Sequence, residues 1–341
     1  MAGAAPRRPR TRPRRTLAWL ALAAALSTGL WLAGERLLAP PTHPRYAEML
    51  AAARSMQAAA QVLWPEKEAR GLLPPPEADP NRTGMIGPEF TGITTSLGDP
   101  ASKRSTTNPD LAAALVRLLS GLDLERGTSV VVVVSGSLVG GNIAAIAAVE
   151  ALGLRPVVIA SLTASMWGAT DPEFNWLEIA GLLRGRGVLR SDTTAAVLGG
   201  NGAVGGGVDP ADLDALRASA ARAGVPIVET RPVAAVIDGL LAHVEAATGG
   251  QRPGAVINVG GALIGLGSCR ESYEFQPGLT LHPVACTSGT PGIAMRLSAE
   301  GVPVLHVLNI RRLSLDLGLP FDPVPLPTPG NNPAVYGSDR P

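Results

Sequence analysis

The stretch that decides the fold lies at residues 129–153 and reads SVVVVVSGSLVGGNIAAIAAVEALG. Its first six residues form an almost entirely apolar run of strand length, and residues 142–152 have the periodicity of a helix. Apolar strands of this kind are buried on both faces, as in a parallel sheet covered by helices. The stretch therefore predicts a strand, a tight Ser-Gly-Ser turn and a helix of an α/β protein.

The same alternation continues on both sides of this stretch. Hydrophobic residues make up 46% of the chain and aromatic residues only 4%, so the core must consist of Ala, Val, Leu and Ile. Strands that alternate with helices predict a Rossmann-like, doubly wound and mainly parallel sheet. We expect further strands at residues 156–160, 194–198, 226–229, 255–259 and 302–308, and further helices at residues 111–122, 210–223, 233–247 and 291–300.

The N-terminal segment has the pattern of a bacterial membrane anchor. Residues 1–15 contain six arginines and no acidic residue, and residues 17–33 (LAWLALAAALSTGLWLA) carry no charge. Seventeen residues lie at the short end of a membrane span, and a basic flank stays in the cytoplasm. We expect a basic cytoplasmic tail at residues 1–15 and an uncleaved transmembrane helix at residues 16–38, with a cleaved signal peptide as the alternative. The main domain is then periplasmic, on the outer side of the inner membrane.

The remaining chain divides by composition into three parts. An Ala-rich segment at residues 46–64 predicts a helix, and Pro65 either ends it or begins the next turn. Four more prolines follow before residue 85. We therefore expect a helical stalk and proline-rich linker at residues 39–84, the α/β domain at residues 85–316, and an irregular, proline-rich tail at residues 317–341.

Charge and composition exclude several classes of function. Six of the 29 basic residues lie in the first fifteen positions, which leaves 23 against 28 acidic residues, a net charge of −5. The domain thus offers no general field for nucleic acid, and any anion site must be local. No dinucleotide, P-loop or zinc pattern is present, so we expect no cofactor and no metal. Cys269 and Cys286 either form a disulfide, which an oxidising compartment permits, or remain buried thiols.

The carboxyl ends of the predicted strands are where a ligand would bind in an open α/β sheet. The residues at those positions are small or polar, and their backbone N–H groups and hydroxyls can bind a phosphate or a carboxylate. A tight turn in which a serine caps the helix is the structural alternative. The candidate binding residues on this rim are Ser135, Gly136, Ser137, Asn142, Ser165, Gly199, Gly200, Asn258, Gly260 and Gly261.

Two further segments add candidates to this rim. Residues 87–109 are dense in hydrogen-bonding side chains, which either contact a ligand carboxylate or hold an ordered loop. Residues 165–176 bring aromatic side chains into a chain that has few, as a lid, a partner-docking surface or an anchor for a long loop. The candidates from these segments are Lys103, Arg104, Asn108 and Trp167.

Two pairings would allow a serine to act as a nucleophile. Lys103 with Ser105 or Ser137 would be a Ser/Lys pair. A serine of the Ser-Gly-Ser turn could instead use His282 or His306 as its base. The G-x-S-x-G motif of a nucleophile elbow is absent, and the sequence alone leaves open whether the protein is an enzyme.

Five strings in the chain are long and unusual. They are GPEFTGITTSLGDPASKRSTTNPD at residues 87–110, VSGSLVGGNIAAIAAVEALG at 134–153, SMWGATDPEFNWLEI at 165–179, NVGG at 258–261 and PGIAMRLSAEGVPVLHVLNI at 291–310. Together they resemble the bacterial poly-gamma-glutamate system protein family, over most of the chain from the anchor to about Ile310. Gly140 and Gly141 replace the bulkier residues usual in that family, which predicts a looser turn before Asn142.

Members of this family are encoded beside the synthase and export components of poly-gamma-glutamate, so the resemblance implies a part in making, exporting or anchoring that polymer. It supplies no catalytic residues. We expect a membrane-anchored accessory or binding component of poly-gamma-glutamate (capsule) biosynthesis and export. Its expected partners are the synthase and export membrane proteins and the polymer itself. The alternative is an extracytoplasmic gamma-glutamyl hydrolase or transferase that acts on the polymer.

Overall fold

The computed structural model describes residues 14–38 and 42–338, with side chains described at residues 17–31 and 42–338. Most of the predicted basic tail lies outside these residues. The chain divides into two compact units, one that contains helix α1 (Arg14–Leu38) and one that spans His43–Gly337. Within the part of the chain that the structure describes, no helix has both the length and the apolar character needed to cross a membrane.

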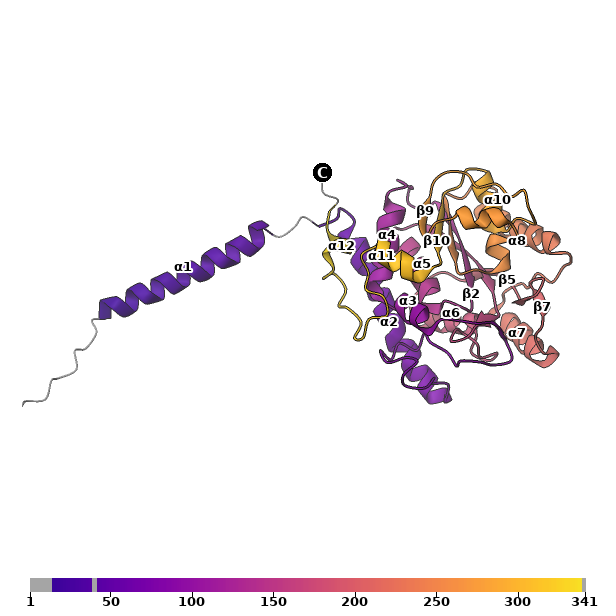
Figure 1. Cartoon of the computed structure of the whole chain (residues 1–341), viewed down its shortest axis with the longest axis horizontal. Coiled ribbons are helices and arrows are strands. Elements are labelled where there is room, and N and C mark those ends of the chain that lie inside the picture. The colour runs from indigo at the N-terminus through magenta and orange to yellow at the C-terminus, as the bar shows by residue number, and fades with distance from the viewer. Residues whose placement is uncertain (1–13, 39–41, 339–341) are drawn as a thin grey trace, which may run out of the picture. The chain divides into compact units, whose positions relative to one another are not determined.

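The larger unit is a mixed α/β domain built on a six-stranded, mainly parallel sheet (Figure 1). In spatial order its strands are β5 (Thr193–Val197), β3 (Arg155–Ser161), β2 (Ser129–Ser135), β8 (Ala255–Val259), β10 (Val304–Val307) and β9 (Gly278–Thr280). Strand β9 pairs antiparallel with β10, and the other neighbours pair in parallel. Two small parallel pairs accompany the sheet, β1 (Thr94–Ser96) with β4 (Ala164–Ser165) and β6 (Gly199–Gly200) with β7 (Val204–Gly206).

Helices cover both faces of this sheet (Figure 1). One face carries α2 (Tyr46–Arg70), α4 (Pro109–Ser120), α5 (Val139–Ala151) and α6 (Trp176–Gly185), and the other carries α8 (Val233–Thr248) and α10 (Ile293–Ala299). The remaining helical elements are α3 (Pro100–Thr106), α7 (Pro210–Ala223), α9 (Leu263–Leu266), the 3-10 turn η1 (Arg270–Glu274), α11 (Ile310–Asp316) and α12 (Pro333–Tyr336).

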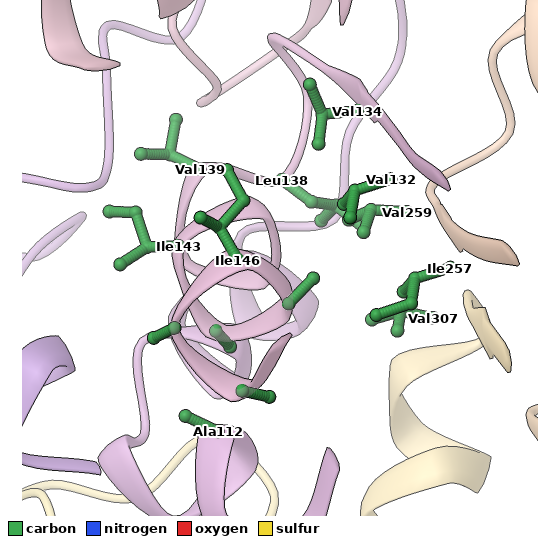
Figure 2. Close-up of a cluster of buried hydrophobic side chains, with 14 of the residues drawn as sticks. Ala112, Val132, Val134, Leu138, Val139, Ile143, Ile146, Ile257, Val259 and Val307 are labelled. Atoms are coloured by element: carbon green, nitrogen blue, oxygen red, sulfur yellow. The ribbon is translucent and has the colours of Figure 1, made fainter. Parts of the chain in front are cut away.

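Strand β2 lies at the centre of the core and is buried on both faces, as its apolar run predicts. Because side chains alternate along a strand, Val132 and Val134 pack with α5 on one face while Val131 and Val133 pack on the other. Figure 2 shows the α5 side with side chains from β2, β8 and β10 directed at the helix. Burial of one such side chain stabilises the fold by about 1.5–3 kcal/mol.

Helix α2 is part of this core, and the expected stalk is wrong. Met49, Met56 and Leu63 of α2 are fully buried, and the helix packs on α4 and α5. Its many alanines present little bulk, which lets the three helices approach closely. The helix also continues through Pro65 to Arg70, so the proline neither ends it nor separates it from the domain. The compact unit therefore begins at His43 rather than at Met85.

The proline-rich C-terminal segment also belongs to the compact unit as far as Gly337. Its short helix α12 buries Tyr336, whose hydroxyl donates a hydrogen bond of 2.7 Å to Asp110 Oδ1. Arg117 of α4 donates to the carbonyl oxygens of Val335 and Gly337. The domain therefore extends past the predicted boundary at residue 316, although most of this segment is irregular as expected.

One predicted strand is absent, and the short strands β1, β4, β6, β7 and β9 were not predicted. Residues 226–229 form no strand, because only Ile227 bridges to Ala196 at the end of the sheet. The edge strand β9 was not predicted, since its three residues Gly278–Thr280 are too short to give a pattern. The other predicted strands and helices are present within a few residues of the expected positions.

Candidate functional site

A cavity of about 600 Å³ opens at the carboxyl ends of the parallel strands. Its wall is formed by the loops that follow β2, β3, β5, β8 and β10, together with β1 and the start of α3. The lining is mostly glycine, serine, threonine and backbone, and it carries two charged side chains, Asp99 and Lys103. Of the predicted site residues, those on the wall are Lys103, Ser135, Ser137, Ser165, Gly199, Gly200, Gly260 and Gly261.

The Ser-Gly-Ser turn after β2 is held by two hydrogen bonds to its backbone. The backbone N–H of Gly136 donates 3.0 Å to Ser161 O at the end of β3, and the Asn142 side chain donates 2.7 Å to Ser135 O. Asn142 is fully buried, so it holds the turn from behind rather than facing the cavity. Gly140 lies so close to the chain that an added Cβ would be 2.5 Å from Thr106 O. Gly140 therefore allows α5 to pack tightly against the end of α3, and the looser turn stays a prediction.

Lys103 is the side chain that connects the segments of the site. It lies on α3, which begins at Asp99 because the carboxylate of this residue caps the helix and Pro100 occupies its first position. Its Nζ donates to the backbone carbonyl of Ser137 and lies 2.7 Å from Ser165 Oγ. The residue is only 4% exposed, yet its ammonium group reaches the cavity wall.

Burial changes the protonation of this lysine. Loss of water around the ammonium lowers the pKa of Lys103 to about 7, against a smaller opposing effect of the Asp99 carboxylate. The other neighbours of Nζ, Ser137 and Ser165, are neutral. At neutral pH the site therefore holds a mixture of charged and neutral lysine, and a small change in surroundings shifts the balance.

Ser165 is held opposite Lys103 by two contacts of its backbone. It belongs to the short strand β4, which pairs with β1 through Ser96, and its N–H donates 3.0 Å to Ser137 Oγ. The hydroxyl groups of Ser137 and Ser165 thus sit on the same wall as the lysine. Three segments far apart in sequence, α3, the turn after β2 and β4, meet at this point.

Arg104, in contrast, does not face the cavity. Its guanidinium forms a two-point ion pair with Asp322 in the C-terminal segment, with distances of 2.7 and 2.6 Å. Successive side chains on a helix point in directions about 100° apart, so Lys103 and Arg104 cannot serve one ligand from the same turn. The candidate Arg104 therefore lies outside the cavity and instead ties the C-terminal segment to α3.

The other candidates outside the cavity lining have structural roles. Asn108 caps α4 by accepting a hydrogen bond of 3.0 Å from the Asp110 N–H. Trp167 adopts a positive φ of 65° and exchanges backbone hydrogen bonds with Gly87 and Pro88. Trp167 therefore fixes the loop, and of the three alternatives for its segment the loop anchor fits these contacts. Gly136 packs on the end of β3 at a distance that admits no larger side chain without movement.

Asn258 and His306 form a buried pair beneath the site. Asn258 Nδ2 donates 2.8 Å to Gly260 O and lies 3.2 Å from His306 Nδ1. Burial lowers the pKa of His306 to about 4, so the ring is neutral at physiological pH. Neither His306 nor His282 lines the cavity, so a serine with a histidine base gains no support here.

The pairing of Lys103 with Ser105 is also wrong, because Ser105 donates to Ala101 O and accepts from the Asp322 N–H.

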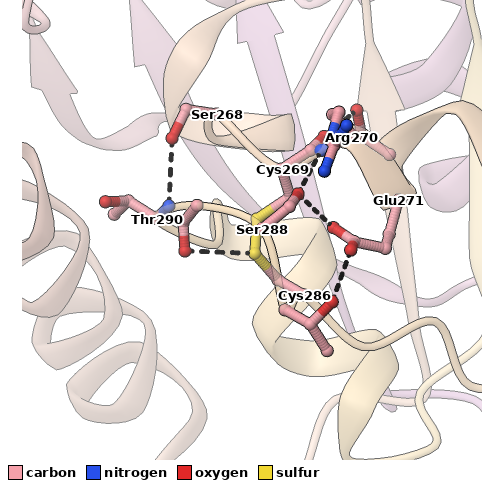
Figure 3. Close-up of a disulfide and its surroundings, with 10 residues drawn as sticks. Ser268, Cys269, Arg270, Glu271, Cys286, Ser288 and Thr290 are labelled. Atoms are coloured by element: carbon pink, nitrogen blue, oxygen red, sulfur yellow. Dashed lines mark hydrogen bonds between the residues drawn. A yellow bond between two sulfur atoms is a disulfide. The ribbon is translucent and has the colours of Figure 1, made fainter.

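The two cysteines form the disulfide Cys269–Cys286 and are therefore not free thiols (Figure 3). Glu271 lies beside this disulfide, and its carboxylate accepts hydrogen bonds of 2.6 and 2.7 Å from Thr287 and Ser288. These hydrogen bonds lower the pKa of Glu271 to about 2. The two sulfurs and this carboxylate lie within 4.8 Å of one another, but bonded sulfurs cannot act as thiolate ligands for a metal.

Comparison with known proteins gives no family for this chain. No family model, curated protein or solved structure matches the chain.

One feature of the composition, separate from the motifs, also points to this site. The chain has 27 arginines and only two lysines, Lys67 and Lys103, and both lysines are buried. An arginine cannot lose its proton in a protein, whereas a buried lysine shifts its pKa readily. The two lysines are therefore candidates for a position that needs a shifted pKa, and their surroundings decide which of them is functional.

Proposed function

We propose that the cavity binds glutamyl carboxylates of poly-gamma-glutamate, and that the protein is a membrane-anchored accessory component of the machinery that makes and exports this polymer. The observation that carries the proposal is the position of Lys103. When charged, its ammonium has three N–H donors, of which two are directed at Ser137 O and Ser165 Oγ. The third remains for a ligand oxygen in the cavity.

The rest of the lining suits a carboxylate-bearing chain better than a phosphate-rich one. One buried cation neutralises one charge, and the serine and threonine hydroxyls around it can donate to the second carboxylate oxygen or to an amide. A polyanion that needed several cations would find only Lys103 on this wall. We therefore infer that one glutamyl unit or the chain end is held, with the next units over the hydroxyl-lined part of the cavity.

Sequence features support the cellular setting of this proposal. The arginine-rich start of the chain and the uncharged residues 17–33 favour a single-pass anchor in the inner membrane with the domain in the periplasm. The helices on both sheet faces and the cavity at the carboxyl ends of the strands favour a doubly wound, Rossmann-like fold. The resemblance of the five sequence strings supports poly-gamma-glutamate as the ligand and its synthase and export proteins as the partners.

Calorimetric binding of poly-gamma-glutamate to the full-length chain in detergent tests the proposal. We expect Lys103→Met to weaken the affinity by at least about tenfold, since a hydrogen bond to a charged group contributes about 1.5–3 kcal/mol. Lys67→Met is the matched control, because Lys67 is equally buried but does not line the cavity. Equal affinity of Lys103→Met and the wild type would overturn the proposal.

The pH dependence gives a second, independent reading of the same binding. The pKa of Lys103 is about 7, so the charged form is lost as the pH rises from 6 to 8.5, while glutamyl carboxylates remain ionised throughout. Affinity should therefore fall over this range, and Lys103→Met should remove the dependence. An affinity that stays constant with pH in the wild type would contradict the role of Lys103.

A further inference from the structure

The contact between Lys103 and Ser165 has the geometry of a base and a nucleophile. Lys103 Nζ lies 2.7 Å from Ser165 Oγ, within the range that proton transfer requires, and both groups lie on the wall of the cavity. We propose that Ser165 attacks a gamma-glutamyl amide with Lys103 as its base, so that the protein transfers or hydrolyses gamma-glutamyl groups. This activity rests on the binding proposed above.

The surroundings of Lys103 orient the amine for this role. A neutral amine has two N–H groups and one lone pair, and one N–H is used by the carbonyl oxygen of Ser137. The lone pair can then accept the hydroxyl hydrogen of Ser165. Burial lowers the pKa of Lys103 to about 7, so the neutral amine is populated near neutral pH.

The nucleophile is Ser165 rather than either serine of the Ser-Gly-Ser turn. Ser135 is 2% exposed and its hydroxyl accepts the Ser137 N–H at 3.4 Å. Ser137 contacts Lys103 through its backbone carbonyl, whereas Ser165 contacts it through its hydroxyl. Ser165 is also half-buried on the cavity wall, so a ligand carbonyl can reach its Oγ.

Ser137 supplies the second hydroxyl of the site. Its Oγ accepts the backbone N–H of Ser165 at 3.0 Å, and a hydroxyl that accepts one hydrogen bond can still donate its hydrogen. We assign to Ser137 a donor role toward the carbonyl oxygen of the amide, where negative charge develops during attack. Its loss should reduce turnover less than loss of Ser165.

Every atom of the reaction is accounted for by these groups and water. The Ser165 hydroxyl gives its proton to neutral Nζ while Oγ bonds to the gamma-carbonyl carbon. The C–N bond then breaks, and the nitrogen keeps the electron pair, takes the proton from Nζ and leaves as an amine. Water or an acceptor amine attacks the resulting ester on Ser165 and gives a proton to Nζ. Oγ recovers that proton as the ester bond breaks, so no oxidant or reductant is needed.

The test uses the full-length chain in detergent with gamma-glutamyl p-nitroanilide as the probe. We expect release of p-nitroaniline and, after acid quenching, a gamma-glutamyl adduct on the peptide that contains Ser165 by mass spectrometry. Ser165→Ala should lose both, with a rate at least about 100-fold lower, because nucleophile and base act together. Ser55→Ala, in α2 and away from the cavity, is the control serine.

Lys103→Arg separates this activity from binding. Arginine keeps the positive charge but cannot accept a proton, so turnover should fall about 100-fold while poly-gamma-glutamate still binds. The wild-type rate should rise with pH through about 7, opposite to the binding affinity. Absence of p-nitroaniline release by the wild type, or an adduct on another residue, overturns this inference and leaves the binding proposal intact. Loss of polymer binding by the wild type would instead overturn the proposed function.

Discussion

The two lysines of this protein are equally buried, at 4% exposure, but they lie in different surroundings. Lys67 of α2 donates 2.8 Å to Ile86 O, faces the carboxylates of Asp79 and Asp171, and lies 6.0 Å from the centre of the Phe174 ring. Lys103 faces two serines at the edge of a cavity. A buried lysine alone therefore does not indicate a site; open space and a hydroxyl partner beside it do.

The pKa values of the two lysines also fail to distinguish them. Burial lowers the pKa of Lys67 to about 8 even though Asp79 and Asp171 raise it, and burial lowers that of Lys103 to about 7. Both shifts have the same main cause, so a lowered pKa does not distinguish the structural lysine from the functional one. The following predictions test whether the surroundings make that distinction.

The largest expected effect is on turnover. Lys103→Arg should lower the rate of p-nitroaniline release about 100-fold, because the base is lost. Lys67→Met should leave the rate per folded molecule unchanged, since this lysine does not line the cavity. The circular dichroism signal of each sample gives its content of folded protein, independently of activity. A similar loss in both variants would remove the distinction between the two lysines.

The next effect is on the pH dependence of stability, which both lysines should share. Each has a folded-state pKa below the unfolded value of about 10.4, so the unfolded chain binds more protons between pH 8 and 10. The free energy of unfolding of the wild type should therefore rise with pH over this range. For Lys67 the contribution is about 3 kcal/mol, at about 1.4 kcal/mol per pKa unit.

Chemical denaturation at pH 7.5 and pH 10 measures the slope of the free energy of unfolding against pH. Lys67→Met and Lys103→Met should each flatten it, because each removes one group that gains a proton on unfolding. A slope that neither variant changes would mean that the two lysines are not desolvated as their burial indicates.

The smallest effect is expected at Arg104, the cation next to Lys103 in the sequence. Asp322→Ala breaks its ion pair, in which both side chains are partly exposed. Such a pair contributes about 0.2–1 kcal/mol, so the melting temperature should fall by only a few degrees at most. Binding of poly-gamma-glutamate should stay at the wild-type value. A tenfold change in affinity would mean that Arg104 contributes to the site after all.

The sequence predicts most of the sheet and its helices, because periodicity and caps are local. Helix α7 is an example: Asp209 caps it, Pro210 occupies its first position and Gly224 ends it in the left-handed conformation. The place of α2 could not be predicted in this way. Its alanine-rich surface has no clear apolar stripe, and only tertiary packing shows that Met49, Met56 and Leu63 face the core.

The sequence also predicted the position of the candidate site but not the contacts between its side chains. The rule that ligands bind at the carboxyl ends of parallel strands placed the rim correctly and named Ser165, while the hydrogen-bonding side chains of residues 87–109 pointed to Lys103. The sequence paired the lysine with Ser105 or Ser137 and missed Ser165, which is 62 residues away and meets Lys103 through the pairing of β4 with β1. It also included Arg104, whose partner Asp322 lies 218 residues further along the chain.

The central claim, that Lys103 is the group which meets a ligand carboxylate, can be tested by following the two lysines directly. Labelling with ¹³C-lysine gives one set of side-chain NMR signals for each of the two lysines, which Lys103→Arg and Lys67→Arg assign. The account predicts that a gamma-glutamyl oligomer moves the Lys103 signal and raises the pKa of Lys103 above about 7, while the Lys67 signal stays in place. A ligand that leaves the Lys103 signal and its pKa unchanged would contradict the account.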